Sequence, residues 1–397
     1  MKKILIVHSN MDIGGAETSL LGLLKSIDYS NYIVDLLLLD PVGDLINLIP
    51  KEVNLLNTNK KYKALVKPIK ETIKEYSVTV ALSRIVAKVV TSFKSKIYKD
   101  VDICYMLKQY SHKYSMKFLP KIKGSYDLAI SFIDPHYIIQ KKVNAKVKMG
   151  WLHTDFSRIN VNKKVDYNMW NGCDYIVCVS DACKEAFDKK YPLLKNNSIV
   201  IENILSLNFI ENQCKNINVD DEIVKSDNVI NICSVGRFSN AKNFDNVPNI
   251  AKRIIKAGYN VKWYLIGYGA DEELIKEKIR EEGMEKNVII LGKKQNPYPY
   301  IKACDLYIQP SRYEGKAVTV REAQILNKPV IISNFATAKS QLENKIDGII
   351  VPMGNKKCAE GIVEVIKDKN LQKALINNTK LKDYSNKKEI EKLYKLI

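Results

Sequence analysis

The sequence repeats one pattern along most of its length: a short apolar run that ends in polar residues, followed by a segment with helical spacing. In the first half these runs are KKILIVHSN, NYIVDLLLLD, YDLAISFID, KVKMGWLHT, CDYIVCVSD and SIVIENIL. Such runs alternating with helices are typical of strands in a mostly parallel sheet. The carboxyl ends of parallel strands meet along one edge, where ligands bind. The pattern therefore predicts an α/β fold with a doubly wound sheet.

The pattern restarts after a polar, Asn- and Asp-rich segment, with VINICSVGRF, VKWYLIGYG, NVIILGKK, CDLYIQPS, KPVIISN and DGIIVP. A chain of 397 residues is also too long for one ordinary core. We therefore expect two Rossmann-like domains that face each other across a cleft. The first covers residues 1–205, a linker covers 206–228, and the second covers 229–380. Residues 381–397 are predicted to form a C-terminal helix that packs on the second domain or crosses back to the first.

Positive charge is concentrated in one stretch. The chain has a net charge of +19, and residues 51–125 hold 17 Lys and Arg against five Asp and Glu, a local charge of +12. An excess of this size suggests anionic lipid, nucleic acid or a phosphorylated substrate as a partner. No known nucleic-acid-binding module and no surface of aromatic and basic residues is recognisable, so nucleic acid is not an expected partner.

The same stretch contains a segment with helical spacing, TVALSRIVAKVVTSF at 79–93. Two interpretations stay open, and they do not exclude each other: an amphipathic helix in a membrane interface, or a helix packed on the domain core with one solvated face. Its apolar positions are Ala81, Leu82, Ile85, Val86, Val89, Val90 and Phe93, with Arg84 and Lys88 elsewhere on the helix and Lys94, Lys96 and Lys99 following.

Several classes of protein are not expected. The N-terminal apolar run is too short for a signal peptide, and no run reaches the roughly 18 apolar residues that span a bilayer. We therefore expect a cytoplasmic protein, or one peripheral on the inner face of the cell membrane. Eight cysteines without a CxxC pair, and no cluster of histidines, argue against a zinc site and for free thiols.

Two glutamates eight positions apart indicate a ligand site. Glu314 lies between the predicted strand CDLYIQPS and the predicted helix AVTVREAQIL, and Gly315 allows a tight turn there. The amides of Lys316, Ala317 and Val318 are expected to be unsatisfied donors at the helix N-terminus, which favours a phosphate. Glu322 follows about two turns later and suits the hydroxyls of a ribose.

Two cations stand in a corresponding place. Arg237 and Lys242 lie in the loop SVGRFSNAKNFD, which follows another predicted strand of the same domain. Arg binds phosphate oxygens in bidentate fashion and Lys adds a point charge. Cations for a diphosphate and acids for sugar hydroxyls together indicate a nucleotide-sugar site.

These motifs resemble the C-terminal domain of GT-B glycosyltransferases, in particular retaining family 4 (group 1). The resemblance covers residues 229–352 through the G-R-x(n)-K loop, LIGYG, VIILGKK, ACDLYIQPSRYEG and the E-x7-E pair. The first half is similar more loosely, through GGAE, GWLHTDF, VCVSDACKEAF and VIENIL. YDLAISFID with WLHTDF is similar to enzymes that assemble bacterial surface polysaccharides such as capsules.

The resemblance implies a retaining transfer of a hexosyl group from a nucleoside-diphosphate sugar, with UDP favoured, to a hydroxyl of a saccharide or lipid-linked saccharide. It also implies no metal and no cofactor, and no DxD-type acidic triplet lies near the site. Residue by residue it assigns Arg237 and Lys242 to the leaving diphosphate, Glu322 to the ribose, Glu314 to the sugar hydroxyls, Gly15 to the diphosphate, and His153 to the donor sugar near the reacting carbon.

The sequence departs from the family pattern in two places. Lys316 and Ala317 stand where the family often has Phe and Gly, so Lys316 is a candidate third cation at the phosphates. SNFATAKSQL replaces the common Gly-Gly and later Glu of that loop, which leaves the donor sugar undetermined. Two alternatives remain: a sugar-nucleotide 2-epimerase of the same fold, and a non-catalytic basic protein that binds nucleic acid or membrane.

Overall fold

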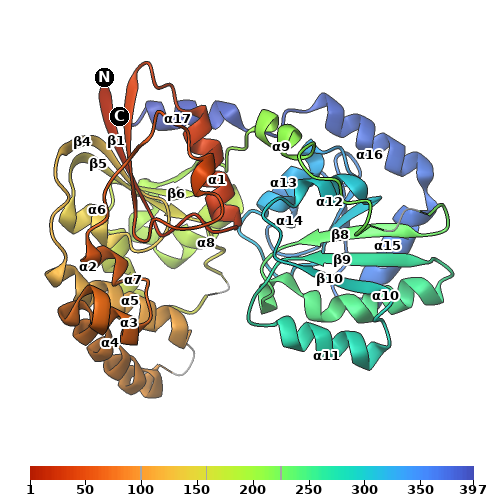
Figure 1. Cartoon of the computed structure of the whole chain (residues 1–397), viewed down its shortest axis with the longest axis horizontal. Helices are drawn as coiled ribbons and strands as arrows, with labels where there is room; N and C mark the ends of the chain where they lie inside the picture. Colours follow the sequence, from red (N-terminus) through yellow and green to blue (C-terminus); the bar gives the residue numbers. More distant parts are fainter. Residues whose placement is uncertain (99–100, 158, 224–225) are drawn as a thin grey trace. The chain divides into compact units, whose positions relative to one another are not determined.

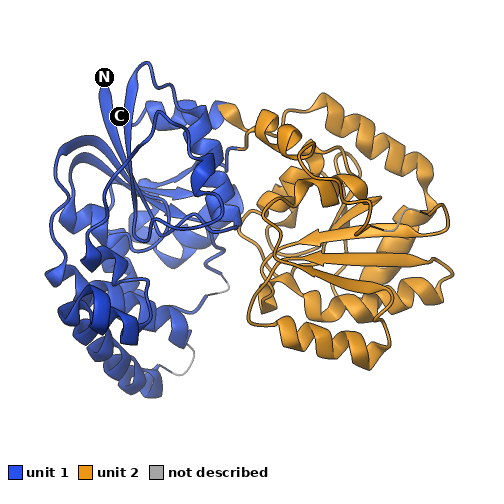
Figure 2. Cartoon of the chain, in the orientation of Figure 1, with its two compact units in different colours: residues 1–204, 388–397 blue, residues 205–387 orange. Residues whose placement is uncertain are grey.

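The computed structural model describes residues 1–98, 101–157, 159–223 and 226–397. The chain divides into two compact units, one formed by residues 1–204 with 388–397 and the other by residues 205–387 (Figure 2). Each unit contains one parallel sheet with helices packed against it (Figure 1). The predicted α/β class is confirmed in both halves of the chain.

Among its described residues, unit 1 has a seven-stranded sheet in the order β3-β2-β1-β4-β5-β6-β7, with every pair parallel. The strands are β1 (Lys2–His8), β2 (Tyr32–Leu38), β3 (Asn54–Leu55), β4 (Ser125–Ser131), β5 (Asn144–Leu152), β6 (Tyr175–Cys178) and β7 (Ser198–Val200). The helices are α1 (Gly15–Ser26), α2 (Lys60–Lys63), α3 (Ile69–Glu71), α4 (Val78–Ile97), α5 (Ile103–Ser115), α6 (Tyr137–Lys142), α7 (Lys163–Trp170), α8 (Asp181–Lys190) and α17 (Ile390–Tyr394).

The described residues of unit 2 form a six-stranded sheet in the order β10-β9-β8-β11-β12-β13, again with parallel pairs. The strands are β8 (Ile230–Val235), β9 (Val261–Ile266), β10 (Val288–Gly292), β11 (Leu306–Gln309), β12 (Val330–Ser333) and β13 (Ile349–Val351). The helices are α9 (Leu207–Gln213), α10 (Val247–Lys256), α11 (Glu272–Glu282), α12 (Tyr298–Ala303), α13 (Val318–Ile325), α14 (Ala338–Gln341), α15 (Asn355–Lys367) and α16 (Lys369–Leu381).

Each sheet reverses its strand order once. In unit 1 the reversal lies between β1 and β4, and in unit 2 between β8 and β11. In open α/β sheets, ligands bind beside the carboxyl ends of the strands at such a switch point. The loops that follow β1, β4, β8 and β11 are therefore where each unit is expected to bind a ligand.

The segment for which the sequence predicts a linker, 206–228, mostly belongs to unit 2. It begins with helix α9, and the side chains of Ile210, Val219 and Ile223 are buried in the core of that unit. Sparse apolar residues in a polar segment are enough to attach it to the core, which composition alone does not indicate. Residues 224 and 225 lie outside the described residues.

The C-terminal residues 388–397 belong to unit 1. Leu393 is fully buried in its core, and the ring of Tyr394 stacks on Tyr32 with centroids 4.4 Å apart. The amide of Asp28 donates a hydrogen bond to the Tyr394 hydroxyl at 2.8 Å. Of the two placements expected for this helix, the structure has the one that returns to the first domain.

In the described parts of the chain, every helix is too short or too polar to cross a membrane.

Candidate active site

The loop after β8 places Lys242 beside the end of that strand. Lys242 ends a short 3-10 turn, Asn240–Lys242, and its side chain passes over Gly236, where an added Cβ would lie 3.0 Å from Lys242 Cε. Gly267, in the loop after β9, approaches even more closely, since its Cβ would lie 1.9 Å from the Gly236 carbonyl oxygen. Gly267 also has a φ of +151°, which L side chains rarely adopt. Gly236 therefore leaves space for the Lys242 side chain, and Gly267 for the backbone of Gly236.

Glu314 reaches the same place from the loop after β11. Its Oε1 forms an ion pair with Lys242 Nζ at 2.5 Å and accepts a hydrogen bond from Ser311 Oγ at 2.6 Å. The side chains of Lys242 and Glu314 are 17% and 10% exposed. Thr337 Oγ1 donates to the Glu314 backbone carbonyl at 2.8 Å and holds the turn. A cation and an acid 72 positions apart are thus in contact at the switch point of unit 2.

A second ion pair ties the two loops together. Arg312 binds Asp245 in bidentate fashion, with nitrogen–oxygen distances of 2.8 and 2.6 Å, and also donates to the Asn240 carbonyl at 2.7 Å. The side chain of Asn243, whose φ is +60°, donates to the Pro310 carbonyl at 2.9 Å. Bidentate Arg–carboxylate pairs fix orientation as well as distance. No motif in the sequence marked Arg312 or Asp245, although both lie close to predicted site residues.

Arg237, the other predicted cation, lies at the start of the β8 loop and its side chain is exposed. Ser239 Oγ donates to its backbone carbonyl at 3.4 Å. An exposed guanidinium at the carboxyl end of a central strand is accessible to an anion.

Glu322 lies on α13 and is only 3% exposed. Tyr298, on α12, donates its hydroxyl hydrogen to Glu322 Oε1 at 2.9 Å. Burial raises the pKa of Glu322 to about 7, and the Tyr298 hydrogen bond offsets that rise only in part. The Glu322 carboxyl group therefore binds a proton at a higher pH than an exposed glutamate does. Tyr298 is a further residue that the sequence did not reveal.

The N-terminus of α13 differs from the expectation of unsatisfied donors. Ala317 is its N-cap residue, and the Ala317 amide donates to Gln341 Oε1 at 2.7 Å, while Gln341 Nε2 donates back to the Ala317 carbonyl at 3.1 Å. Lys316 is 8% exposed, and its Nζ donates to the Ser340 carbonyl at 2.5 Å. The segment around α14 therefore occupies the Ala317 amide and the Lys316 ammonium, two donors that were expected to bind a phosphate. The neighbouring Gly315 and Val318 are both buried.

The two site residues predicted in the first half lie in unit 1. Gly15 is exposed at the start of α1, and Glu17 in the same turn accepts a hydrogen bond from His8 at 3.2 Å. His153 follows β5, and its Nε2–H donates to the Phe132 carbonyl at 2.8 Å. Burial lowers the pKa of His153 to about 4, so its imidazole is neutral at pH 7.

A charged cluster that the sequence did not reveal lies after β4, at the switch point of unit 1. Asp134 pairs with Lys108 at 2.9 Å and lies 3.5 Å from His136 Nε2. His136 Nδ1 is 2.9 Å from Ser131 Oγ. Burial disfavours the Asp134 carboxylate, but Lys108, His136 and His112 outweigh that effect and lower its pKa. The contributing residues come from separate elements, which explains why no local motif marked them.

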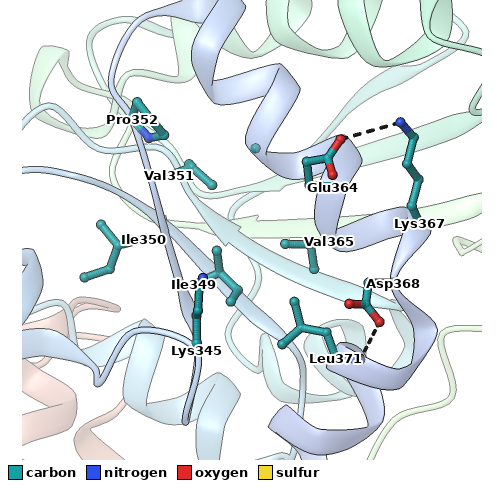
Figure 3. A pocket seen from close by; sticks show the side chains of 11 residues that line it. Lys345, Ile349, Ile350, Val351, Pro352, Glu364, Val365, Lys367, Asp368 and Leu371 are labelled. Carbon is teal, nitrogen blue, oxygen red and sulfur yellow. Dashed lines mark hydrogen bonds and ion pairs between the residues drawn. The ribbon is translucent and has the colours of Figure 1, made fainter.

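Two depressions in unit 2 contain none of the predicted site residues. One, of about 590 Å³, lies between β13 and α15 and includes Ile349, Glu364 and Leu371 in its lining (Figure 3). The other, of about 310 Å³, has Arg321, Lys339 and Lys382 in its lining. Within the described residues, no group of three or more His, Cys, Asp or Glu side chains is arranged to hold a metal ion.

The second half of the chain is similar to a known protein family. Residues 217–382 match the family model described as "Glycosyl transferases group 1". The capsular polysaccharide biosynthesis glycosyltransferase CapM from Staphylococcus aureus is 29% identical over 210 residues, which cover 51% of this chain and 55% of CapM. An uncharacterized glycosyltransferase from Methanocaldococcus jannaschii is 25% identical over 177 residues, 43% of this chain and 42% of that protein. The chain spans about half or less of the length of the first curated relatives that it matches.

Solved structures match over the whole chain. Anabaena HepE in complex with UDP and glucose superposes with a TM-score of 0.69 at 18% identity, covering 100% of both chains. A point mutant of TarM from S. aureus, in complex with Fondaparinux, alpha-GlcNAc-glycerol and UDP, also has a TM-score of 0.69, at 14% identity, covering 100% of this chain and 99% of that one. At such identities the likeness establishes the fold, which is GT-B. Residues 217–382 of this chain therefore resemble a group 1 glycosyltransferase domain, and the chain has the GT-B fold.

Proposed function

We propose that the chain is a glycosyltransferase of bacterial surface-polysaccharide synthesis. It transfers a hexosyl group from a nucleoside-diphosphate sugar, with UDP as the nucleotide, to a hydroxyl of a saccharide or lipid-linked saccharide. The observation that carries the proposal is the contact between Lys242 and Glu314 at the switch point of a group 1 glycosyltransferase domain. The names of relatives such as CapM, and the UDP bound to HepE, support the substrate class.

The ion pair supplies both kinds of group that this donor requires. A diphosphate oxygen replaces the carboxylate as the partner of Lys242 Nζ, and hydroxyls of the transferred sugar then donate to Glu314. The exposed guanidinium of Arg237 adds a second cation for the diphosphate. Glu322, in its ionised form, accepts hydrogen bonds from the ribose. Gly15 and His153 of unit 1 keep the roles near the diphosphate and the donor sugar that the family resemblance implies.

Catalysis follows from charge stabilisation. As the bond between the anomeric carbon and the diphosphate oxygen breaks, the carbon becomes oxocarbenium-like and the diphosphate gains negative charge. Cations already positioned where that charge develops lower the barrier. We assign this work to Arg237 and Lys242. The acceptor hydroxyl attacks from the face that the diphosphate leaves and gives its proton to the departing diphosphate oxygen, so that the anomeric configuration is retained.

The partners and the location belong to the same proposal. One relative, from Campylobacter jejuni, is named as an N-acetylgalactosaminyltransferase that acts on a diphospho-undecaprenol-linked saccharide, and it is 24% identical over 151 residues. We extend this acceptor class to the present chain and place it in the cytoplasm, peripheral on the inner face of the membrane.

Titration calorimetry with UDP, followed by a screen of nucleotide-sugars with and without saccharide acceptors, tests the function. We expect UDP to bind and one UDP-sugar to be consumed in an acceptor-dependent reaction with the anomeric configuration retained. Release of a free 2-epimerised sugar without acceptor would instead identify a sugar-nucleotide 2-epimerase. No interaction with UDP or with any nucleotide-sugar would refute the proposal.

A further inference from the structure

Helix α4 of unit 1 buries mostly small side chains and exposes most of its large apolar ones. The side chains on its buried face include the small residues Ala81, Ser83, Ala87 and Thr91. Large apolar side chains point away from the core: Phe93 is 66% exposed and Ile97 is 73% exposed. The helix is therefore packed on the rest of unit 1 with one exposed face, as one of the two interpretations expected, but the exposed face carries most of its large apolar side chains. Figure 1 shows α4 at the periphery of unit 1.

The exposed apolar side chains form one continuous stripe, which we call the outer face of α4. At 3.6 residues per turn they lie within an arc of about 120° on the helix. A stripe of this width normally faces a core. Exposed apolar patches larger than a few hundred Å² on soluble proteins mark interaction sites. The outer face consists of Leu82, Ile85, Val86, Val89, Phe93 and Ile97.

The outer face is held in place by the contacts of the opposite side of the helix. Ser77 caps the N-terminus of α4 by accepting from the Val80 amide, and Ser83 Oγ lies 2.8 Å from Ser115 Oγ of α5. The guanidinium of Arg84 is turned inward and donates to the carbonyls of Ala64 and Lys67 at 2.7 and 2.5 Å. The outer face is thus preformed and does not depend on folding upon binding.

Basic side chains border the outer face. The sequence of α4, VTVALSRIVAKVVTSFKSKI, contains no acidic residue. At 100° per residue, Lys88 and Lys94 flank the stripe on opposite sides, and Lys96 lies near its C-terminal end. The surrounding stretch, residues 51–125, carries a charge of +12. Apolar side chains with a basic border are the combination that binds an anionic lipid interface.

We infer that the outer face of α4 docks unit 1 onto an anionic bilayer surface. The helix lies in the plane of the interface, with the six apolar side chains among the acyl chains and the lysines at the headgroups. Charge complementarity selects this occupant over a second copy of the chain, because two outer faces in contact would bring like-charged lysines together. The inference concerns a surface apart from the residues of the proposed donor site.

Vesicle co-sedimentation of the full chain tests the inference. The vesicles are phosphatidylcholine alone and phosphatidylcholine with about 30 mol% phosphatidylglycerol, at low and high salt, to match the anionic surface of an inner leaflet. We expect binding to the anionic vesicles, weaker binding at high salt and little binding to pure phosphatidylcholine. Equal binding to both vesicles, or binding to neither at low salt, would overturn the inference.

Matched variants locate the surface. Leu82→Glu or Phe93→Glu is expected to lower the partition coefficient by more than about tenfold, because a carboxylate then has to enter the interface. Leu193→Glu is the control, since Leu193 is 82% exposed and lies in the same unit but outside α4. The paired reversal of Lys88 and Lys96 to Glu is expected to cost more than about fivefold per lysine, because each reversal removes an attracted charge and adds a repelled one. The same reversal of Lys189 and Lys195 should cost much less. Unchanged binding of the α4 variants would show that another surface binds lipid and would overturn the inference.

Two further measurements test whether the variants fold and whether a second copy of the chain covers the outer face. Circular dichroism should show that the α4 variants fold, as expected for substitutions of exposed residues. Analytical ultracentrifugation without lipid should show that Leu82→Glu does not change the oligomeric state. A dimer that this substitution dissociates would show that a second copy covers the outer face, and the inference would fall. Because the readout is lipid binding, its outcome is independent of whether the chain binds UDP.

Discussion

Two acids, one in each unit, have pKa values that are shifted in opposite directions. Glu322 in unit 2 is buried and accepts a hydrogen bond from Tyr298, and its pKa is raised to about 7. Asp134 in unit 1 has Lys108 at 2.9 Å and two histidines nearby, and its pKa is lowered. Burial raises the pKa of both groups, so the difference lies in the neighbouring cation. A cation beside such an acid lowers its pKa, whereas burial with only a neutral donor leaves the pKa raised.

The switch points of the two sheets have related ion pairs. Each has a lysine paired with an acid: Lys242 with Glu314 in unit 2, and Lys108 with Asp134 in unit 1. In unit 2 both residues come from loops that follow central strands, while in unit 1 the lysine comes from helix α5. The pair in unit 2 forms part of the proposed donor site. The pair in unit 1 keeps a carboxylate ionised in a largely buried place.

The largest expected effect is on the pH dependence of stability through Glu322. Its folded-state pKa of about 7 exceeds the ordinary value of 4.5, so the folded state retains a proton that the unfolded state releases. Stability is therefore expected to fall as pH rises from about 4.5 to 7, by about 3 kcal/mol for this group. Glu322→Gln should remove that component. Hydrogen exchange of the β11 and β12 amides at pH 5 and pH 8 measures this change in the free energy of unfolding within unit 2.

Glu360→Gln, an exposed substitution on α15, is the control for Glu322→Gln. If the protection of the β11 and β12 amides changes between pH 5 and pH 8 by the same amount in the wild type and in Glu322→Gln, then Glu322 is ionised at both pH values. The contrast with Asp134 would then be lost.

Removing both cations of unit 2 is the next largest effect. The double substitution of Arg237 and Lys242 by Ala should lower turnover of the donor sugar by about 10²-fold or more, because charge then develops on the diphosphate without a partner. Lys256→Ala, at the exposed end of α10, is the control. Steady-state kinetics with the UDP-sugar found in the screen measures it. Normal turnover by the double variant would contradict the assigned roles.

Glu314→Gln should separate binding from transfer. The substitution leaves Lys242 without its ion-pair partner, so UDP affinity should stay the same or increase. The transferred sugar loses an acceptor for its hydroxyls, so transfer should fall by about tenfold. Calorimetry with UDP and kinetics with the UDP-sugar give the two readouts. Weaker UDP binding with unchanged turnover would place Glu314 at the nucleotide instead of the sugar.

Much of the fold could be predicted from the sequence because its strands are continuous apolar runs. β1, β8 and β11 are buried on both faces and stand out as ILIV, INICSV and LYIQ. Helix α4 was predicted from its spacing, but spacing cannot show which face is buried. That depends on the contact with α5, where most of the buried side chains of α4 are small. The attachment of residues 206–223 to unit 2 depends in the same way on tertiary contacts.

The structure brings two of the predicted site residues together through a contact that the sequence did not predict. Lys242 and Glu314 were both identified from local motifs, whereas their ion pair depends on the pairing of β8 with β11, which no local pattern records. Gln341 accepts the hydrogen bond of the Ala317 amide from 24 positions away. The predicted donor at that helix end is therefore occupied by a residue that no local motif connects with it.

The smallest expected effect is that of Asp134→Asn in unit 1. Because the folded-state pKa of Asp134 is lowered, its carboxylate stabilises the fold above the ordinary pKa of 3.8, and that contribution is lost as pH falls below it. Since Lys108 is 48% exposed, solvent screens the pair, and the substitution should cost about 1 kcal/mol at pH 7. Hydrogen exchange of β1 and β4 measures it, with the exposed Glu185→Gln on α8 as control. The difference from wild type should shrink below about pH 4, the reverse of the trend for Glu322. If it grows instead, then the cation at Lys108 does not hold Asp134 ionised, and the contrast between the two units has another cause.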